Sequence, residues 1–276
     1  MPKLEINGVG IYYELDGTGE ETIVFLNGIM MSTASWADFV EVYTRNGYRM
    51  LRVDFRDQGQ SDKCLEKYNI NQHVEDIRGL FDHLGLARVH MMGISYGGQV
   101  ALLFALKYGA RLKSLILANT TARLTNYLKA IGQAWDEAAR TGEGEKFFKL
   151  AMPYIYSDRF YETHYDWLKE REKFFSQLLT KDWFDAYLRL SSSHGDYNIL
   201  DQLGEIEVPT LVIGADKDIV TPLEEVKKIH EAIKNSLFIV LPEAGHASCY
   251  EKKDEFNAAI LGFLALQKSK QNVVVP

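Results

Sequence analysis

Seven short runs of apolar and β-branched residues, each bounded by turn residues, recur along the chain and predict β-strands. They are IYYEL at 11–15, TIVFLNG at 22–28, YRMLRVDF at 48–55, RVHMMGIS at 88–95, SLILANT at 114–120, PTLVIGAD at 209–216 and LFIVLPEAG at 237–245. From the third run onward, we expect the strands to be buried on both faces of a sheet, because strands of that kind are nearly continuously hydrophobic.

Segments of helical periodicity lie between several of these strands. The clearest are 34–47, 69–86 and 97–110, where apolar residues recur every three or four positions. Strands that alternate with helices form parallel βαβ units. The sequence therefore predicts an α/β fold, with a mostly parallel central sheet and helices on both faces.

One long stretch, from about 121 to 207, contains no convincing strand and interrupts this alternation. Aromatic residues recur through it, often at helical spacing, and predict a helical insertion into a core formed by 1–120 and 208–276. Most of these aromatic side chains are expected to form a core, and the others to line a pocket. The pocket candidates are Trp135 and Trp183, together with Asn27 and Gly28. The periodic charged positions of the last predicted helix stop before 271–276, which indicates a C-terminal tail outside any helix or strand.

Composition and charge exclude several classes of protein. The formal net charge is −7 and no cluster of Lys and Arg occurs, which argues against a nucleic-acid partner. We find neither a secretion signal nor a run of eighteen apolar residues, so we expect a cytoplasmic enzyme without a membrane span. The two cysteines, Cys64 and Cys249, are far apart in the sequence and are expected to be buried and reduced.

A GxSxG motif, Gly93-Ile94-Ser95-Tyr96-Gly97, joins a predicted strand to an apolar helix. In that context the motif holds a serine on a strained turn, where its hydroxyl stands clear of the strand end. The pentapeptide alone is a weak signal, and a tight turn that only packs or binds phosphate is the alternative. No other glycine-rich phosphate motif accompanies it. We interpret Ser95 as a candidate nucleophile.

A serine nucleophile needs an imidazole to accept its proton and a carboxylate to orient that imidazole. His246 follows a predicted strand at the carboxyl edge of the sheet, where sites in open α/β sheets collect. The other six histidines fall within predicted helices, a strand or the insertion. His246 is therefore the candidate base.

Two aspartates compete to orient this histidine, because both follow the strand at 209–216. Asp218 lies deeper in the loop, and Pro222 can begin the next helix so that the loop turns back toward His246. We prefer Asp218, and Asp216 remains the alternative, with a role in bracing the turn. Asn119 ends the preceding strand and cannot act as a carboxylate.

Negative charge that develops on a carbonyl oxygen is stabilised by backbone N–H groups already directed at it. The candidate donors are the amides of Tyr96, which begins the helix after the motif, and of Ile29, in the turn that follows the strand at 22–28. Gly28 would also suit a plain loop that needs its backbone freedom.

With the order Ser95, Asp218, His246, the chain resembles the α/β-hydrolase superfamily over nearly its full length. TIVFLNGIM resembles the oxyanion strand and loop, VDFRDQGQSD the Asp-x-Arg-Gly-x-Gly-x-Ser segment, MGISYGGQVAL the elbow, LVIGADKDIVTP the acid loop and LPEAGHASCYEKKDEFN the histidine loop. The chain is most similar to small esterases, enol-lactonases and cofactor-free haloperoxidase-like enzymes. The resemblance implies a helical cap over the site.

Two positions depart from the family pattern. Most relatives carry His-Gly where this chain has Asn27-Gly28, and Arg-Gly where it has Arg56-Asp57. We expect the turn at Asn27 to persist through local hydrogen bonds, and Asp57 to lie at the surface.

The expected activity is cleavage of a small-molecule carboxylic ester or lactone through an acyl-Ser95 intermediate, with no metal or organic cofactor. Cleavage of a thioester, C–C or amide bond, or perhydrolysis, would use the same residues. A non-catalytic small-ligand receptor on the same fold is a further alternative. The sequence leaves the oligomeric state open.

Overall fold

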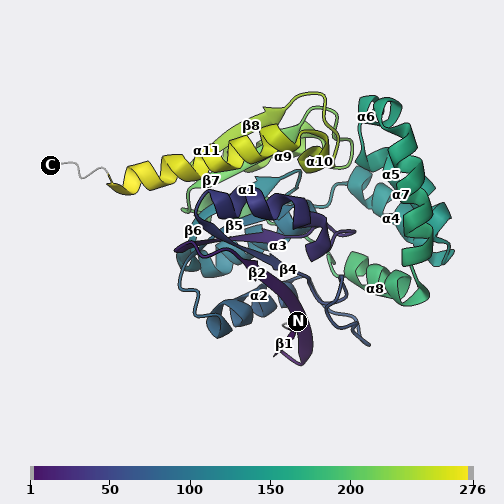
Figure 1. Ribbon diagram of the computed structural model, residues 1–276, viewed down its shortest axis with the longest axis horizontal. Coiled ribbons are helices and arrows are strands. Elements are labelled where there is room, and N and C mark those ends of the chain that lie inside the picture. The colour runs from purple at the N-terminus through teal and green to yellow at the C-terminus, as the bar shows by residue number, and fades with distance from the viewer. Residues whose placement is uncertain (1–2, 273–276) are drawn as a thin grey trace.

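The computed structural model describes residues 3–272 of the chain. Within these residues the centre is an eight-stranded sheet of order β1-β2-β4-β3-β5-β6-β7-β8 (Figure 1). The six strands from β3 to β8 are parallel, and β1 and β2 are antiparallel additions at one edge. The strands are β1 (Lys3–Ile6), β2 (Val9–Asp16), β3 (Glu21–Leu26), β4 (Tyr48–Val53), β5 (Val89–Ile94), β6 (Leu112–Ala118), β7 (Thr210–Ala215) and β8 (Ser236–Leu241).

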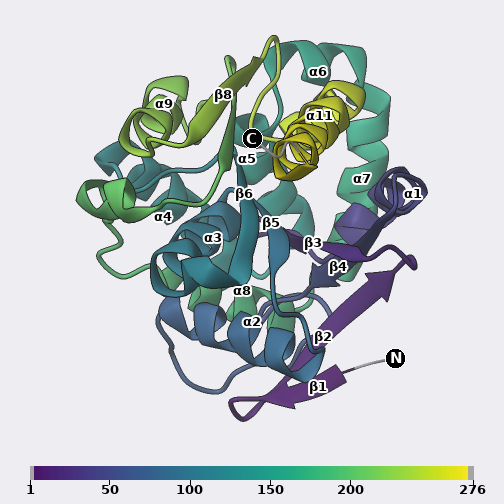
Figure 2. The same ribbon diagram turned by 90° about the vertical axis from the view of Figure 1, so that its left-hand side faces the viewer.

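Helices cover both faces of the sheet (Figure 2). One hydrophobic cluster joins one face to α2 (Asn71–His83), α3 (Tyr96–Tyr108) and α9 (Leu223–Ala232), and a second joins the other face to η1 (Thr33–Phe39), α1 (Val40–Arg45) and α11 (Lys253–Asn272). α3 is hydrophobic on almost all sides because it packs over β5 and β6 in the middle of the sheet. The short elements are η2 (Gly109–Arg111), η3 (Leu200–Glu205) and α10 (Ser248–Glu251).

The predicted α/β class and the mostly parallel sheet are confirmed, but two strands differ from expectation. The sequence reading missed β1, a four-residue strand that pairs with β2 through a tight Asn7-Gly8 turn in which both residues have positive φ. β8 was expected to be buried on both faces, and this is wrong: it is an edge strand with exposed Leu237 and Val240. An apolar run does not reveal which strand will lack a neighbour.

Between β6 and β7 lie five α-helices, which we call the helical insertion, followed by the short η3: α4 (Asn126–Arg140), α5 (Gly144–Ile155), α6 (Asp158–Thr163), α7 (Tyr165–Leu178) and α8 (Lys181–Ser192). They stand at one end of the sheet, at the right of Figure 1. Side chains of α4, α5 and α8, among them Trp135, Phe147 and Tyr187, form a separate hydrophobic cluster, which also includes Val220 of the loop after β7.

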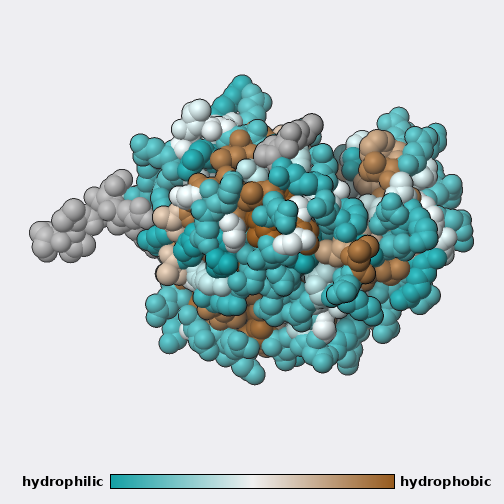
Figure 3. Space-filling model, turned by 90° about the horizontal axis from the view of Figure 1, so that it is seen from below, coloured by the Kyte–Doolittle hydropathy of each residue, from teal (hydrophilic) through white to brown (hydrophobic). Residues whose placement is uncertain are grey.

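The surface is mostly hydrophilic, with separate hydrophobic patches, some of them on the side of the helical insertion (Figure 3). None of the helices within residues 3–272 is both long and apolar enough to cross a membrane. The tail predicted at 271–276 begins inside α11, which continues to Asn272, and its last four residues lie outside the described part of the chain.

Asp57 does not lie at the surface as expected, but is buried beneath the helical insertion. It adopts a φ of 69°, a left-handed conformation that favours glycine, and its side chain forms an ion pair with Arg189 of α8 at 2.7 Å. It also accepts a hydrogen bond from the amide of Cys64, which is only partly buried rather than buried as expected. The ion pair connects the insertion to the core. This contact explains why an aspartate occupies a position where glycine would adopt the same φ without strain.

We predict that Asp57→Gly lowers the free energy of unfolding by about 2 kcal/mol. Leaving Arg189 unpaired in a partly buried position costs about 3 kcal/mol, and removing the backbone strain returns about 1 kcal/mol. Glu243→Gly is the matched control, because Glu243 also has a positive φ and an ion pair to the insertion, through Arg159, but one exposed to solvent. Urea denaturation should show less than about 1 kcal/mol of change there. Equal losses in both variants would contradict the role given to Asp57.

Candidate active site

Ser95 stands on the turn between β5 and α3, with a φ of 52° and a ψ of −119°. Two glycines permit this turn. A Cβ on Gly93 would lie 2.3 Å from the carbonyl oxygen of Gly97, and a Cβ on Gly97 would lie 2.4 Å from that of Leu26. No side chain fits at either position without moving the backbone, so the GxSxG spacing follows from the close contact of chain segments here.

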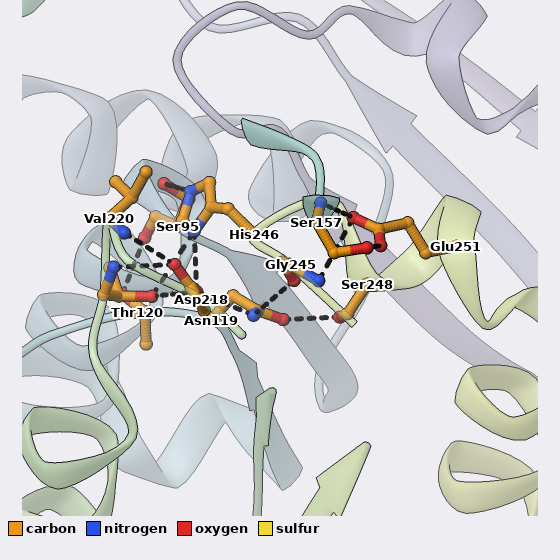
Figure 4. A network of polar contacts seen from close by, with 11 residues as sticks. Ser95, Asn119, Thr120, Ser157, Asp218, Val220, Gly245, His246, Ser248 and Glu251 are labelled. Atoms are coloured by element: carbon orange, nitrogen blue, oxygen red, sulfur yellow. Dashed lines mark hydrogen bonds and ion pairs between the residues drawn. The ribbon is translucent and has the colours of Figure 1, made fainter. Parts of the chain in front are cut away.

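The structure brings the three predicted residues Ser95, His246 and Asp218 into one line of hydrogen bonds (Figure 4). Nε2 of His246 lies 2.8 Å from Oγ of Ser95, and Nδ1 lies 2.8 Å from Oδ2 of Asp218. Because β5, β7 and β8 are parallel, the loops that follow them meet at the same edge of the sheet.

Asp218 is buried, but its carboxylate is fully hydrogen-bonded. Oδ1 accepts bonds from the amides of Val220 and Thr221 at 2.8 and 2.9 Å, and Oδ2 accepts from Oγ1 of Thr221 and Nδ2 of Asn119 at 2.5 and 2.8 Å. Burial by itself would raise the pKa of Asp218. The charge and hydrogen bond of His246, with the bonds from Thr221 and Asn119, outweigh burial and lower the pKa below its ordinary value, so the ionised form is favoured.

Asp216, the alternative acid, lies elsewhere. Its side chain is exposed, and Oδ1 accepts a hydrogen bond from the amide of Glu243 at 2.7 Å, which braces the turn between β7 and the histidine loop. The structure therefore directs Asp218, not Asp216, at His246.

Sequence reasoning missed the side chains that hold these loops together. Oγ of Ser248 donates to Oδ1 of Asn119 at 2.6 Å, so Asn119 joins the histidine loop to Asp218. Glu251 accepts hydrogen bonds from the amides of Gly245 and Ser157, each at 3.1 Å, and from the Ser157 hydroxyl (Figure 4). These contacts connect the histidine loop to the start of α6. In the sequence, the only indication of a role for these residues was that they lie near His246 or at the end of a strand.

The two candidate oxyanion donors flank Ser95. Tyr96 is the first residue of α3, so its N–H has no acceptor within the helix. The N–H of Ile29 has no hydrogen-bond acceptor in the part of the chain that the structure describes. Gly28 lies close enough that a Cβ there would contact the Cβ of Ser95 at 3.7 Å. Both amides are thus free to bind an oxygen.

Asn27 does not line the cavity at Ser95, which corrects our expectation for this residue. Its side chain is fully buried: Nδ2 donates to the carbonyl of Val53 at 2.8 Å, and Oδ1 accepts from Nε1 of Trp36 at 2.8 Å. The turn at Ile29 is held instead by Gln58, whose Nε2 donates to the carbonyl of Gly28 at 2.8 Å. Gln58 lies in the VDFRDQGQSD segment, and no local pattern there indicates its contact with Gly28.

A mostly apolar cavity of about 120 Å³ opens at Ser95 and His246, and we call it the apolar cavity. Gly28, Trp135 and Trp183 line it, as the sequence suggested. Its other walls come from Ile29, Met30, Met31, Ser35, Ile94, Phe147, Phe148, Met152, Ile155, Tyr156, Arg171, Phe175, Leu179, Ala247, Cys249 and Tyr250. Burial raises the pKa of the Cys249 thiol to about 12, which keeps that group neutral. No group of His, Cys, Asp and Glu that could hold a metal ion occurs within residues 3–272.

The parallel sheet, the strand-turn-helix at Ser95 and the loops that meet beside it define an α/β-hydrolase enzyme. The chain belongs to this family: the family model described as alpha/beta hydrolase fold matches residues 21–253. The resemblance seen in the sequence is thereby confirmed.

Several known proteins are similar over almost their whole length. The structure of MGS-M2, an alpha/beta hydrolase enzyme from a Medee basin deep-sea metagenome library, is 40% identical with a TM-score of 0.92, covering 96% of this chain and 97% of that one. The enol-lactonase from Burkholderia xenovorans LB400 is 25% identical with a TM-score of 0.82, covering 96% and 100%. A 2-hydroxy-6-oxononadienedioate/2-hydroxy-6-oxononatrienedioate hydrolase from Paraburkholderia phymatum is 26% identical, covering 92% and 90%.

We predict that Asp218→Asn lowers kcat on a p-nitrophenyl ester by about four orders of magnitude, because an amide no longer holds His246 in the required tautomer. Asp216→Asn is the matched control in the same loop and should stay within a few-fold of the parent enzyme. Steady-state kinetics of both variants test this, and a larger loss at Asp216 would reverse the assignment.

Proposed function

We propose that this enzyme is a serine hydrolase that cleaves a carboxylic ester or lactone through an acyl-Ser95 intermediate. The observation that carries the proposal is the pair of 2.8 Å contacts that link Ser95 to His246 and His246 to Asp218. A hydroxyl in that position can transfer its proton as it attacks a carbonyl carbon.

In the first half-reaction, Oγ of Ser95 bonds to the carbonyl carbon while its proton moves to Nε2 of His246. The carbonyl oxygen becomes negative, and the amides of Ile29 and Tyr96 donate hydrogen bonds to it. The tetrahedral intermediate then collapses: the C–O bond to the leaving alcohol breaks, and His246 returns the proton to the leaving oxygen. Asp218 stabilises the imidazolium between these steps.

The second half-reaction repeats the sequence with water. His246 removes a proton from a water molecule, the hydroxide adds to the acyl carbon, and the bond to Ser95 breaks as Oγ regains the proton. The products are an acid and an alcohol, or one hydroxy acid when the substrate is a lactone.

We further propose that the helical insertion is a cap. α4, α5, α7 and α8 contribute apolar and aromatic side chains to the apolar cavity, so a substrate at Ser95 would be enclosed between insertion and core. Such enclosure excludes water and strengthens the electrostatic interactions at the reacting carbonyl.

The apolar cavity has one unusual wall residue, Arg171 of α7. Its guanidinium stacks over the rings of Trp167 and Phe175 at 4.7 and 5.2 Å, and it has no ion pair within residues 3–272. A cation of this kind at an apolar cavity favours a substrate in which an apolar group carries a carboxylate.

The same feature favours one second candidate, hydrolysis of a C–C bond beside a ketone. The similar hydrolase from Paraburkholderia phymatum is named for substrates that are dicarboxylates, and Arg171 would suit a substrate of that charge. The steps at Ser95 and His246 would be the same, with a carbon leaving group in place of the alcohol oxygen.

Ser95→Ala should abolish turnover of a p-nitrophenyl ester and prevent labelling by a fluorophosphonate probe. The melting temperature should change little, because alanine replaces serine without adding bulk. Turnover that persists in folded Ser95→Ala would refute the nucleophile. Failure of the parent enzyme to react with the probe would favour a ligand-binding protein on the same fold.

Arg171→Met should raise the inhibition constant of phenylacetate about tenfold, because a charge-assisted hydrogen bond is worth about 1.5 kcal/mol. The neutral isostere phenylacetamide should inhibit the parent and the variant equally. Arg140→Met is the control, since Arg140 pairs with Glu137 on the exposed side of α4. Equal effects on both inhibitors would show that Arg171 acts by packing alone.

A further inference from the structure

A second cavity, of about 300 Å³, meets the apolar cavity at Ser95, and we call it the second cavity. Ile29, Ser95 and Trp135 line both spaces, so a substrate at Ser95 can extend one arm into each. The other walls of the second cavity include residues of α3, α4 and α8 and of the loop after β7.

The two cavities differ in how they reach solvent. The residues that line the apolar cavity all belong to the described part of the chain, and each of them is buried or half-buried. The second cavity has exposed residues in its walls, on α4, on α8 and in the loop after α8: Lys129, Gln133, Ser192, Gly195 and Asp196. The second cavity therefore leads from solvent to Ser95, and the apolar cavity is the more enclosed end of the site.

One face of α4 runs along the second cavity. Leu128, Gly132, Trp135 and Asp136 all line it, at the spacing of three and four residues that places side chains on the same face of a helix. Gly132 lies in the middle of this face. A Cβ built there would meet no atom of the described residues within 4 Å. A side chain at this position would therefore enter the second cavity, and glycine leaves that space free.

Helix packing does not explain this glycine. Glycine is unfavourable inside a helix, and two other helical glycines have a packing reason. A Cβ on Gly79 of α2 would lie 2.7 Å from Cγ2 of Ile6, and one on Gly98 of α3 would lie 2.6 Å from Cβ of Thr120. Gly132 has no such neighbour among the described residues, so its effect is to keep the second cavity wide.

We propose that the second cavity is the route by which a substrate enters and the place where its longer arm lies, and that Gly132 determines how much room this arm has. The inference rests on the proposed ester hydrolysis and specifies its substrate class. The substrate is an ester with one compact apolar arm, which fits the enclosed apolar cavity of about 120 Å³, and one extended arm that reaches toward solvent. The extended arm ends among polar residues such as Lys129 and Gln133.

Gly132→Leu tests the proposal, because it places a side chain in the second cavity. Two pairs of esters vary the length of one arm at a time: p-nitrophenyl acetate and p-nitrophenyl octanoate for the acyl arm, and ethyl phenylacetate and octyl phenylacetate for the alcohol arm. In one pair, the variant should lower kcat/KM of the long ester relative to the short one by about tenfold, because leucine and the extended arm would occupy the same space. The pair that responds identifies the extended arm.

Gly132→Ala should give a smaller change in the same pair, because its side chain is shorter. Both variants should keep or raise the melting temperature, since each replaces a helical glycine with a better helix former. A ratio of long to short ester that is unchanged or raised in both pairs would overturn the proposal.

Gly262→Leu is the matched control. Gly262 lies inside α11 with the same open space around a built Cβ, but it is exposed and lines neither cavity. This variant should leave both ratios unchanged. Equal changes in Gly132→Leu and Gly262→Leu would refute the role of Gly132. Failure of the parent enzyme to hydrolyse any of the four esters would instead overturn the proposed function.

Discussion

The close contact of three chain segments at Ser95 is the constraint on which the site depends. Gly93 and Gly97 lie so near to neighbouring backbone that neither accepts a side chain, and this contact forces Ser95 into a positive φ between β5 and α3. The serine hydroxyl then faces the loops after β7 and β8, and the amide of Tyr96 begins α3 with no acceptor of its own. Candidate nucleophile and candidate oxyanion donor thus come from the same strained turn.

Three polar contacts join the core to the helical insertion, or to the segment that follows it, near the turn at Ser95. Asp57 pairs with Arg189, Glu251 binds Ser157 together with the histidine loop, and the hydroxyl of Tyr96 lies 2.5 Å from that of Ser193. Each contact connects the insertion, or the segment that follows it, to a residue within or next to the candidate site. The geometry at Ser95 and the placement of the insertion are therefore physically coupled.

Two cavities with different walls meet at Ser95. Aromatic and aliphatic side chains with a single guanidinium, that of Arg171, line the apolar cavity, whereas the second cavity, of about 300 Å³, has a larger share of polar residues in its walls, among them Gln99 and Asp136. The proposed mechanism uses the groups where the cavities meet. Selection among substrates would then depend on the cavity walls, many of which come from the helical insertion and lie far from the GxSxG motif in the sequence.

The amino-acid sequence by itself determined the class of fold, and it was enough to select Ser95, His246 and Asp218 as the candidate residues that the structure brings together. Continuous apolar runs, helical periodicity and the GxSxG turn are local patterns, and local patterns determine strands, helices and tight turns. Tertiary structure alone decided that β8 is an edge strand, that Asp57 is buried against Arg189, that Asn27 points away from the cavity, and that Asn119 and Glu251 hold the loops. The physical reason is that these outcomes depend on contacts between distant segments: Asp57 binds a residue 132 positions away, Asn119 one 99 positions away and Glu251 one 94 positions away, and no local pattern records such packing.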